Sequence, residues 1–439
     1  MKKVFKIITI IISSVFALIL ITAVGLGIIF RNEISAISSI KLLKPRVENS
    51  LQCGIYEMTC KGDYYFEDYL ACGGAKNDRE LLDFIMNKMT KGLLKIKINT
   101  SKIGCSSFTA RKQNGEHLFA RNYDLYATNT CIVRVKGNKK RHASISTVDT
   151  SFINIPARAD MNNLLSKAYA LAAPYAPLDG LNDAGVSCGI YMTYQGAGKN
   201  VIATDQNTEL PDISPTALIR LILDYADSLD EAVNFARSYD MHDSAGTSFH
   251  IMVADRSGRS AILEWVNDTD ESDNYGSLRK LVVTYNDQDS NIGQREGEAD
   301  FQWITNFIIQ PGYYKVYDKD LTGWERYNII YDELSKSDGL VADEMAAMDI
   351  LHKVSQRTVR PDRNADDFVL TIHSVIYNLD NLTTLWCGNE QYDDKDGMFR
   401  YKLNSKKRIL NKEKTFLVAL QGQFSVLVPP EFRRINFMF

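Results

Sequence analysis

The first thirty residues constrain this chain more than any other stretch. Lys2, Lys3 and Lys6 precede an uncharged run of 24 residues, Ile7 to Phe30. About 20 apolar residues in a helix cross the hydrocarbon core of a bilayer, whereas a secretory signal has an apolar region of only about 7–15. The run is long for a buried core helix, and no small-x-small cleavage site stands out. We therefore expect an uncleaved signal anchor, with a cleaved secretory signal as the alternative.

The charges around this run and in the remaining chain indicate where the protein works. Lysines before the span place the N-terminus inside the cell and the rest of the chain outside, so we expect a single-pass protein of the cell membrane with an extracytoplasmic body, or a secreted protein if the signal is removed. Hydrophobic residues make up 45% and charged residues 24%, which indicates a globular body. A net charge of -3 lacks the excess of basic residues that nucleic-acid binding proteins usually carry. The membrane is therefore an expected partner and nucleic acid is not.

The cysteines and histidines show no metal-binding pattern. The seven cysteines are Cys53, Cys60, Cys72, Cys105, Cys131, Cys188 and Cys387. None are spaced C-x-x-C, and the six histidines never pair as H-x-x-x-H, so we expect neither a metal nor a cofactor. An exported body can hold disulfides, and the close spacing of the first three cysteines favours one local bond there. The odd count leaves at least one cysteine unpaired within the chain.

The chain changes character at residue 105. Residues 31–76 have the mixed composition of a stalk and loop, and Asn77 followed by Glu80 predicts a capped helix over about 78–94. A short strand-like run, 96–98, and a polar break, 99–102, follow. From residue 105 the pattern is typical of strands, beginning with a hairpin at Asn114-Gly115. Two capped helices, starting after Ser214 and Ser228, separate these strands from later ones, which favours sheets covered by helices over a βαβ array.

Cys105 is the candidate nucleophile of the β-rich part. A cysteine reacts as a thiolate and needs a base or a cation nearby. The chain has neither an obvious histidine partner nor a papain-type signature. If Cys105 becomes the first residue after a cut, its own α-amino group, with a pKa of about 7.7–8.0, can take the thiol proton. Arg121 would then lower the thiol pKa and Asp124 would hold the amino group. From these residues alone, a buried strand cysteine remains the alternative.

Five motifs follow one another over roughly residues 105–390. They are Cys105-Ser-Ser-Phe-Thr-Ala with Gly115-Glu-His-Leu-Phe-Ala-Arg121-Asn-Tyr-Asp124, then Asp179-Gly-Leu-Asn-Asp-Ala-Gly-Val186, Phe249-His-Ile-Met-Val-Ala-Asp-Arg-Ser-Gly258 with Glu264, Thr305-Asn306-Phe307, and Gly323-Trp-Glu-Arg326-Tyr. In type and order these motifs resemble those of the choloylglycine hydrolase family, which includes bile salt hydrolases and penicillin V acylases and is related to the isopenicillin N acyltransferase and acid-ceramidase branches.

The resemblance implies a fold and a role for each site residue. The fold is the α+β Ntn-hydrolase sandwich with four layers, αββα, behind the N-terminal transmembrane helix. Cys105 would attack an amide carbonyl, and Arg121 and Asp124 would set the charge around its amino group. The side-chain amide of Asn306 would donate to the oxyanion, together with a backbone N–H near residues 191–192. Arg326 would orient the site through charge-assisted hydrogen bonds.

Each of these positions also has an interpretation without catalysis. Arg121 and Asp124 can form a surface ion pair, Asn306 can cap a turn, and Arg326 can be a solvated helix charge. Asn286 is a rival to Asn306, but it lacks the preceding threonine. Asn182 is expected to be a turn residue rather than a catalytic one.

The sequence departs from the family in two places. Bile salt hydrolases have an asparagine, and penicillin V acylases a tyrosine, near the position of Met192, which leaves bile-salt specificity in doubt. In addition, 104 residues precede the nucleophile. The acyltransferase and ceramidase branches remove such a segment by an N→S acyl shift, so the resemblance implies autoproteolysis between Gly104 and Cys105.

These patterns predict three regions: a signal anchor at 1–30, a propeptide or linker with a short helix at 31–104, and one catalytic domain at 105–439. The predicted activity is cleavage of a linear, non-peptide amide bond in an N-acylated small molecule through a thioester acyl-enzyme. The alternatives are an acyltransferase of the isopenicillin N type and a membrane-anchored binding protein with an inactive site. Loops at about 126–165 and 193–212 are expected to line the substrate pocket. The sequence does not determine whether the chain forms a homo-oligomer, since dimers and tetramers both occur among relatives.

Overall fold

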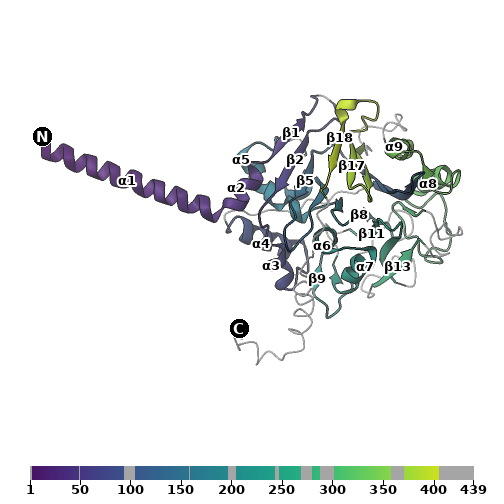
Figure 1. Ribbon diagram of the computed structural model, residues 1–439. Helices are drawn as coiled ribbons and strands as arrows, with labels where there is room; N and C mark the ends of the chain where they lie inside the picture. The colour runs from purple at the N-terminus through teal and green to yellow at the C-terminus, as the bar shows by residue number, and fades with distance from the viewer. Residues whose placement is uncertain are drawn as a thin grey trace.

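Two β-sheets packed face to face form the body of the molecule (Figure 1). The computed structural model describes residues 2–48, 50–92, 104–157, 159–195, 204–242, 247–267, 279–286, 301–356 and 370–404. The strands of the first sheet are, in spatial order, β1 (Lys41–Lys44), β2 (Ile55–Cys60), β5 (Thr130–Val135), β6 (Ser144–Asp149), β7 (Asp179–Asn182), β8 (Val186–Met192), β11 (Phe249–Asp255), β12 (Ser260–Val266) and β13 (Lys280–Tyr285).

The second sheet carries most of the residues that the sequence singled out. Its spatial order is β14 (Trp303–Ile304), β3 (Gly104–Lys112), β4 (His117–Leu125), β16 (Leu370–Asn378), β17 (Thr383–Gly388) and β18 (Met398–Lys402), and β15 (Leu340–Val341) also pairs with β3. Side chains of the two sheets meet in the interior. For example, the Trp386 indole of β17 donates to the Thr147 hydroxyl of β6 over 3.3 Å.

Helices cover both outer faces of the sheets. The described helices are α1 (Lys2–Ile29), α2 (Arg31–Ile37), α3 (Phe66–Ala71), α4 (Asp78–Met89), α5 (Leu164–Tyr169), α6 (Pro215–Tyr225), α7 (Leu229–Arg237), α8 (Trp324–Ser335) and α9 (Glu344–Lys353). Helices α6 and α7 pack on β7, β8, β11 and β12, whereas α8 and α9 pack on β3, β4 and β16. The predicted four-layer αββα architecture is thus confirmed. Strands β8, β11 and β12 are buried along their whole lengths because both of their faces are covered.

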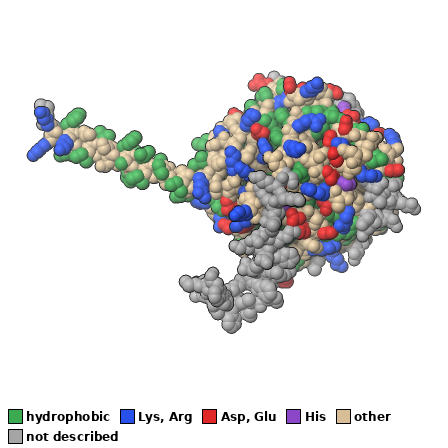
Figure 2. Space-filling model, viewed as in Figure 1, with side chains coloured by type: hydrophobic (Ala, Val, Ile, Leu, Met, Phe, Trp, Pro, Cys, Tyr) green, Lys and Arg blue, Asp and Glu red, His purple; other side chains and the backbone are tan. Residues whose placement is uncertain are grey.

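Helix α1 projects from the body (Figure 1). It is 28 residues long, and none of its side chains is buried. Figure 2 shows apolar side chains along its length and basic side chains at its free end. By length and composition it is able to cross a membrane, as the sequence predicted, and a signal sequence near the N-terminus would have the same properties.

The segment behind this helix is more structured than the stalk and loop expected for residues 31–76. Strand β2 pairs in parallel with β5 over its full length, from Ile55 opposite Thr130 to Cys60 opposite Val135. The expectation was wrong because this pairing is non-local, while the nearby antiparallel pairing of β2 with β1 is short and interrupted by a bulge, so neither gives a clear hairpin signal. The expected local disulfide is also absent. No disulfide joins any of the seven cysteines, all of which lie among the described residues; Cys60 is buried and Cys72 is exposed.

The local helix and turn signals were better guides. Asn77 accepts a hydrogen bond from the Glu80 amide as the predicted N-cap of α4. The helix ends at Met89 rather than near 94, because the chain turns through positive φ angles at Lys91 and Gly92. The predicted strand at 96–98 and the break at 99–102 lie outside the described residues.

Candidate active site

Cys105 lies at the start of β3, with its side chain buried between the two sheets. The predicted turn at Asn114-Gly115 joins β3 to β4, with Gly115 at a positive φ of 89° that a side chain would disfavour. The resulting register sets Cys105 opposite Tyr123 and Gly104 opposite Asp124. A single hairpin therefore brings the candidate nucleophile close to two of the predicted site residues.

Arg121 reaches the thiol from β4. Its Nη2 lies 3.6 Å from Cys105 Sγ and 2.6 Å from the Ile190 carbonyl oxygen of β8. Burial raises the pKa of the Cys105 thiol, and the nearby Arg121 charge acts in the opposite direction. In the intact chain the thiol is thus held mostly protonated beside a fixed cation that would stabilise its ionised form.

Arg121 is itself held by a network that the sequence analysis did not identify. Asp179 of β7 accepts hydrogen bonds from Arg121 Nη1 (2.5 Å) and from the Tyr377 hydroxyl (2.5 Å), and its Oδ2 lies 2.9 Å from His373 Nε2. Burial opposes ionisation of this carboxyl, but His373 and Arg121 outweigh it and lower its pKa. Asp179 is the first residue of the D-G-L-N motif quoted above. That motif is the one sequence signal that pointed to Asp179.

Asp124 occupies the other side of Cys105. Its carboxylate accepts hydrogen bonds from the Thr371 hydroxyl (2.8 Å) and the Gln356 amide (3.1 Å), and it lies 3.4 Å from Arg326 Nη1. Burial raises its pKa, although Arg326 and these hydrogen bonds act in the opposite direction. A Cβ built on Gly104 would lie 3.2 Å from the Asp124 carboxylate. The carboxylate is therefore adjacent to the peptide bond that the sequence marked for cleavage.

Asn306 and Arg326 complete the group. The Cys105 amide donates to Asn306 Oδ1 (2.9 Å), and the same oxygen accepts from Arg326 Nη2 (2.7 Å). Arg326 Nη1 also donates to the Ser106 hydroxyl (2.6 Å) and to the Cys105 carbonyl. The five predicted site residues thus meet around Cys105, with Arg121 at its sulfur, Asn306 at its nitrogen and Arg326 between its carbonyl and Asp124.

One detail of the group differs from the predicted roles. The Asn306 amide nitrogen was expected to face an oxyanion, but in the intact chain it donates to the Met192 carbonyl over 2.6 Å. A side-chain amide has two N–H groups, so this bond uses only one of them.

The two other asparagines considered are turn residues. Asn182 accepts from the amides of Ala184 and Val186, and so closes the turn before β8. Asn286 exchanges hydrogen bonds with Ser260 and Gly258, next to the β11–β12 turn. Neither asparagine contacts Cys105 through these hydrogen bonds, in agreement with the lower rank assigned to both above.

Comparison with known families agrees with this geometry. Residues 110–391 match the model of the family described as acyl-coenzyme A:6-aminopenicillanic acid acyl-transferase. Because the match covers more than half of the chain, the protein belongs to this family, one of the groups of N-terminal nucleophile amidases and acyltransferases. The matched range includes Arg121, Asp124, Asn306 and Arg326, and it begins just after Cys105. No curated protein sequence matched the chain significantly.

Solved structures with a similar chain trace include the following three. A variant of the conjugated bile acid hydrolase from Clostridium perfringens is 13% identical, with a TM-score of 0.41, and the match covers 69% of this chain and 98% of that one. Penicillin V acylase from Agrobacterium tumefaciens is 14% identical, with a TM-score of 0.38 and coverages of 65% and 83%. The N-acylethanolamine-hydrolyzing acid amidase orthologue from Caenorhabditis elegans is 16% identical, with a TM-score of 0.38 and coverages of 68% and 100%.

Proposed function

We propose that this protein is a membrane-anchored cysteine amidase that cleaves the linear amide bond of an N-acylated small molecule through a thioester. The observation that carries the proposal is the convergence on the Cys105 backbone nitrogen. In the intact chain this nitrogen is an amide bonded to Asn306 Oδ1. After a cut at Gly104–Cys105 it becomes a free amino group within reach of its own thiol, which is the arrangement that an N-terminal nucleophile requires.

The cut itself is proposed to use the same side chains. Asp124, with its raised pKa, takes the Cys105 thiol proton, and the thiolate attacks the Gly104 carbonyl carbon. The C–N bond breaks as the amide nitrogen gains a proton, leaving a thioester between Gly104 and Cys105 Sγ. Water then hydrolyses this thioester, which releases the Gly104 carboxylate, the Cys105 thiol and a free α-amino group.

Turnover would follow with the amino group as the base. It accepts the thiol proton, the thiolate attacks the substrate carbonyl, and the amino group returns the proton to the leaving amine. Arg121, 3.6 Å from the sulfur, stabilises the thiolate between turnovers. Asn306 would donate to the oxyanion with its amide nitrogen; loss of one such donor typically costs about 2.7–4 kcal/mol in the transition state.

Acyl transfer is a second candidate, because the matching family model is named for an acyl-transferase. In that reaction an amine, rather than water, resolves the acyl-enzyme. Mass spectrometry of the products formed with a competing amine separates the two reactions. Hydrolysis predicts the free acid at all amine concentrations, whereas transfer predicts that the new amide replaces it.

Intact-mass and N-terminal sequencing of the purified chain test the proposed nucleophile. We expect two fragments, with Cys105 as the first residue of the larger one, and a single uncut chain for Cys105→Ala. Cys131→Ala, which changes another buried cysteine on β5, is the matched control and should be cut like the wild type. A Cys105→Ala chain that is still cut, or a wild-type chain that stays whole, would contradict the proposal and favour an inactive binding protein.

The membrane anchor is part of the same proposal. Helix α1 and its preceding lysines favour a body held on the extracytoplasmic side of the cell membrane. Protease protection of the body in inverted and right-side-out vesicles tests this orientation, and protection in right-side-out vesicles would contradict it.

A further inference from the structure

A second cluster of ionisable side chains lies away from Cys105, where two short strands pair. Strand β9 (Asp212–Ile213) runs parallel to β10 (Asp240–Met241), so that Asp212 lies opposite Asp240. Strand β9 leads into α6, and β10 follows α7. The pair therefore closes the base of the α6–α7 hairpin, and His242 follows directly after it.

The side chains of this cluster converge on a small volume. His242 Nε2 lies 2.7 Å from Asp212 Oδ1 and 3.9 Å from Asp240 Oδ1. One ligand atom from each of these three residues lies within 4.8 Å of the other two. Asp205 Oδ1 lies 3.7 Å from the other ring nitrogen, Nδ1. Three carboxylates thus surround a single imidazole.

One carboxylate oxygen in the cluster is buried without a hydrogen bond. Asp240 is only 1% exposed. Its Oδ2 accepts from the Thr208 amide over 2.5 Å, but Oδ1 has no hydrogen-bond partner among the described residues. Burying an acceptor without a donor is costly, and such atoms in native proteins commonly mark a bound water or ion. This oxygen is the one that lies toward His242 Nε2.

The charges of the cluster do not balance without a cation. Within the described residues, the ion pairs formed by Asp212 and Asp240 are with His242 alone. Even with a protonated imidazole, Asp212 and Asp240 together leave an excess of negative charge. A bound cation would neutralise this excess.

We propose that Asp212 Oδ1, Asp240 Oδ1 and His242 Nε2 bind one divalent cation of the Mn²⁺ or Zn²⁺ class. Mixed carboxylate and imidazole donors suit these ions, and water would complete the coordination. Two ligands at about 2.1 Å from a tetrahedral ion lie about 3.4 Å apart, so His242 must move away from Asp212 by less than an ångström. The ion takes the place of the proton on Nε2, which is released to solvent.

The proposed ion would fasten parts of the chain that are distant in sequence. It closes the loop between residues 212 and 240 around α6 and α7, and it would stabilise the folded chain because the site exists only there. The backbone at Asp212 also contacts the segment that precedes Cys105, because the Asp212 amide donates a hydrogen bond to the Gly73 carbonyl over 2.9 Å. Gln206, between Asp205 and β9, accepts from the Met241 amide and the Trp265 indole. A bound ion would therefore fix the position of residues 205–212, at the end of the 193–212 loop that is expected to line the pocket.

Titration with Mn²⁺ followed by electron paramagnetic resonance tests the site. The full-length Cys105→Ala chain in detergent is used, because this variant has no reactive thiolate at position 105, and Mn²⁺ has little affinity for the exposed Cys72 thiol. We expect one bound Mn²⁺ per chain and a higher unfolding temperature when it binds. Asp240→Asn and His242→Gln should each weaken binding by at least about tenfold and remove the thermal shift. Zn²⁺ and Ca²⁺ are compared by the same thermal shift.

Asp230→Asn is the matched control, since Asp230 is an exposed aspartate paired with Arg259. It should bind Mn²⁺ like the parent chain. If Asp240→Asn does not fold, Asp212→Asn, whose side chain is partly exposed, replaces it. Absence of saturable binding by the parent chain with all three ions, or undiminished binding by the site variants, would overturn the proposal and leave the cluster as an ion-paired histidine.

Discussion

At the scale of single residues, the site depends on a buried arginine with two functions. Arg121 stands beside the Cys105 sulfur, and its other nitrogen binds Asp179, so its position is set by the opposite sheet. Burying a guanidinium is costly unless a carboxylate pairs with it, and here His373 and Tyr377 keep that carboxylate ionised. We therefore expect Asp179 to be a positioning residue that acts on the thiol through Arg121.

Replacing Asp179 by asparagine hardly changes the volume of the side chain, but it should markedly slow the proposed cut before Cys105. Arg121 would keep its charge but lose its anionic partner, so we expect destabilisation by about 3–5 kcal/mol and a cut slowed by at least tenfold. The pH dependence of the rate of Cys105 alkylation distinguishes this effect from a loss of stability. A misplaced Arg121 would stabilise the thiolate less and so shift the pH midpoint of alkylation upward. Asp332→Asn, at an exposed position of α8, is the control. An unchanged alkylation midpoint in a folded Asp179→Asn chain would show that Asp179 has only a structural role.

Sequence alone identified the residues of the site that share local motifs. Cys105, Arg121 and Asp124 lie on one hairpin, so their proximity follows from the turn at Asn114-Gly115. Asp179, Gln356 and Thr371 could not be assigned in the same way. Thr371 reaches Asp124 through the non-local pairing of β16 with β4, Gln356 reaches it from the segment after α9, and Asp179 reaches Arg121 from the opposite sheet. Contacts between segments so far apart leave no spacing rule in the sequence.

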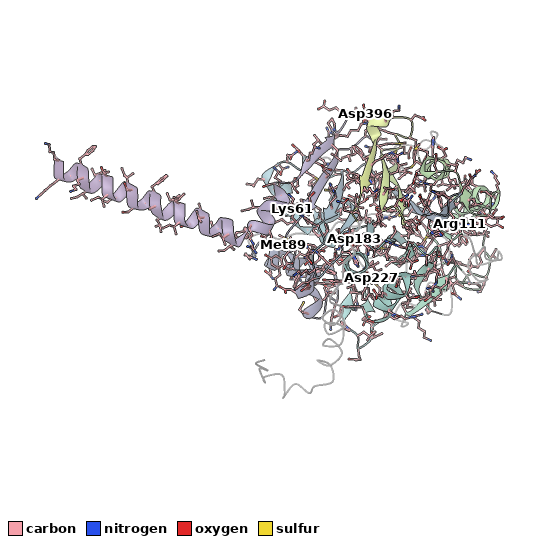
Figure 3. The ribbon with its side chains drawn as sticks, in the orientation of Figure 1. Lys61, Met89, Arg111, Asp183, Asp227 and Asp396 are labelled. Atoms are coloured by element: carbon pink, nitrogen blue, oxygen red, sulfur yellow. The ribbon has the colours of Figure 1, made fainter. Side chains whose placement is uncertain are left out.

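At the scale of elements, ion pairs hold the ends of helices against the sheets. His142 Nδ1 lies 2.6 Å from Asp183, in the turn after β7, and Nε2 lies 3.0 Å from Asp227, just beyond α6. The two carboxylates are labelled close together in Figure 3. Burial alone would lower the pKa of His142, but the two aspartates raise it to about 9. The imidazolium therefore joins α6 to the first sheet.

This bridge predicts a pH-dependent contribution to stability. A histidine whose folded-state pKa is raised stabilises the fold fully below its ordinary value of about 6.5, and the effect is lost as pH rises through about 9. His142→Gln should lower the free energy of unfolding by about 2–3 kcal/mol at pH 6 and by much less above pH 10. Denaturant unfolding at several pH values measures this difference. A constant difference at all pH values would assign the effect to packing instead of charge.

The elements themselves were predictable where their signals were local. The caps at Asn77 and Ser228 lie where the capping-box spacing predicted them. Strand β2 was missed because its full-length partner, β5, follows some 70 residues later in the chain, and its nearby partner, β1, pairs with it only over a short, bulged stretch. Helix α4 was predicted too long because the left-handed turn at Lys91 and Gly92 overrides its apolar periodicity.

At the scale of the whole molecule, the leading segment and the body share one core. Strands β1 and β2 belong to the first sheet, and the Tyr64 hydroxyl donates to Asp224 of α6. Tyr64 and Tyr69 are almost completely buried against Tyr175. If the chain is cut before Cys105, these contacts remain, because none of them depends on the broken bond.

The cut fragments should therefore stay together under native conditions. We expect the larger fragment to sediment with membranes although only the smaller one carries α1, and to separate from it in urea. Sodium carbonate washing, which removes peripheral proteins, should release little of it, and the uncut Cys105→Ala chain provides the reference. Release of the larger fragment into the soluble fraction without denaturant would contradict this prediction.

The parallel pairing of β2 with β5 also sets the order of events during biogenesis. Without β2, strand β5 would expose an open edge of consecutive buried residues, Cys131 to Val133, which is a template for aggregation. A gene that began at Cys105 would thus produce a chain with the nucleophile ready but the sheet incomplete. Because the residues around Cys105 meet only after both sheets have assembled, the proposed scission would take place only in a folded chain. A chain that fails to fold would then stay in one piece, and the proposed amino-terminal amine would not form.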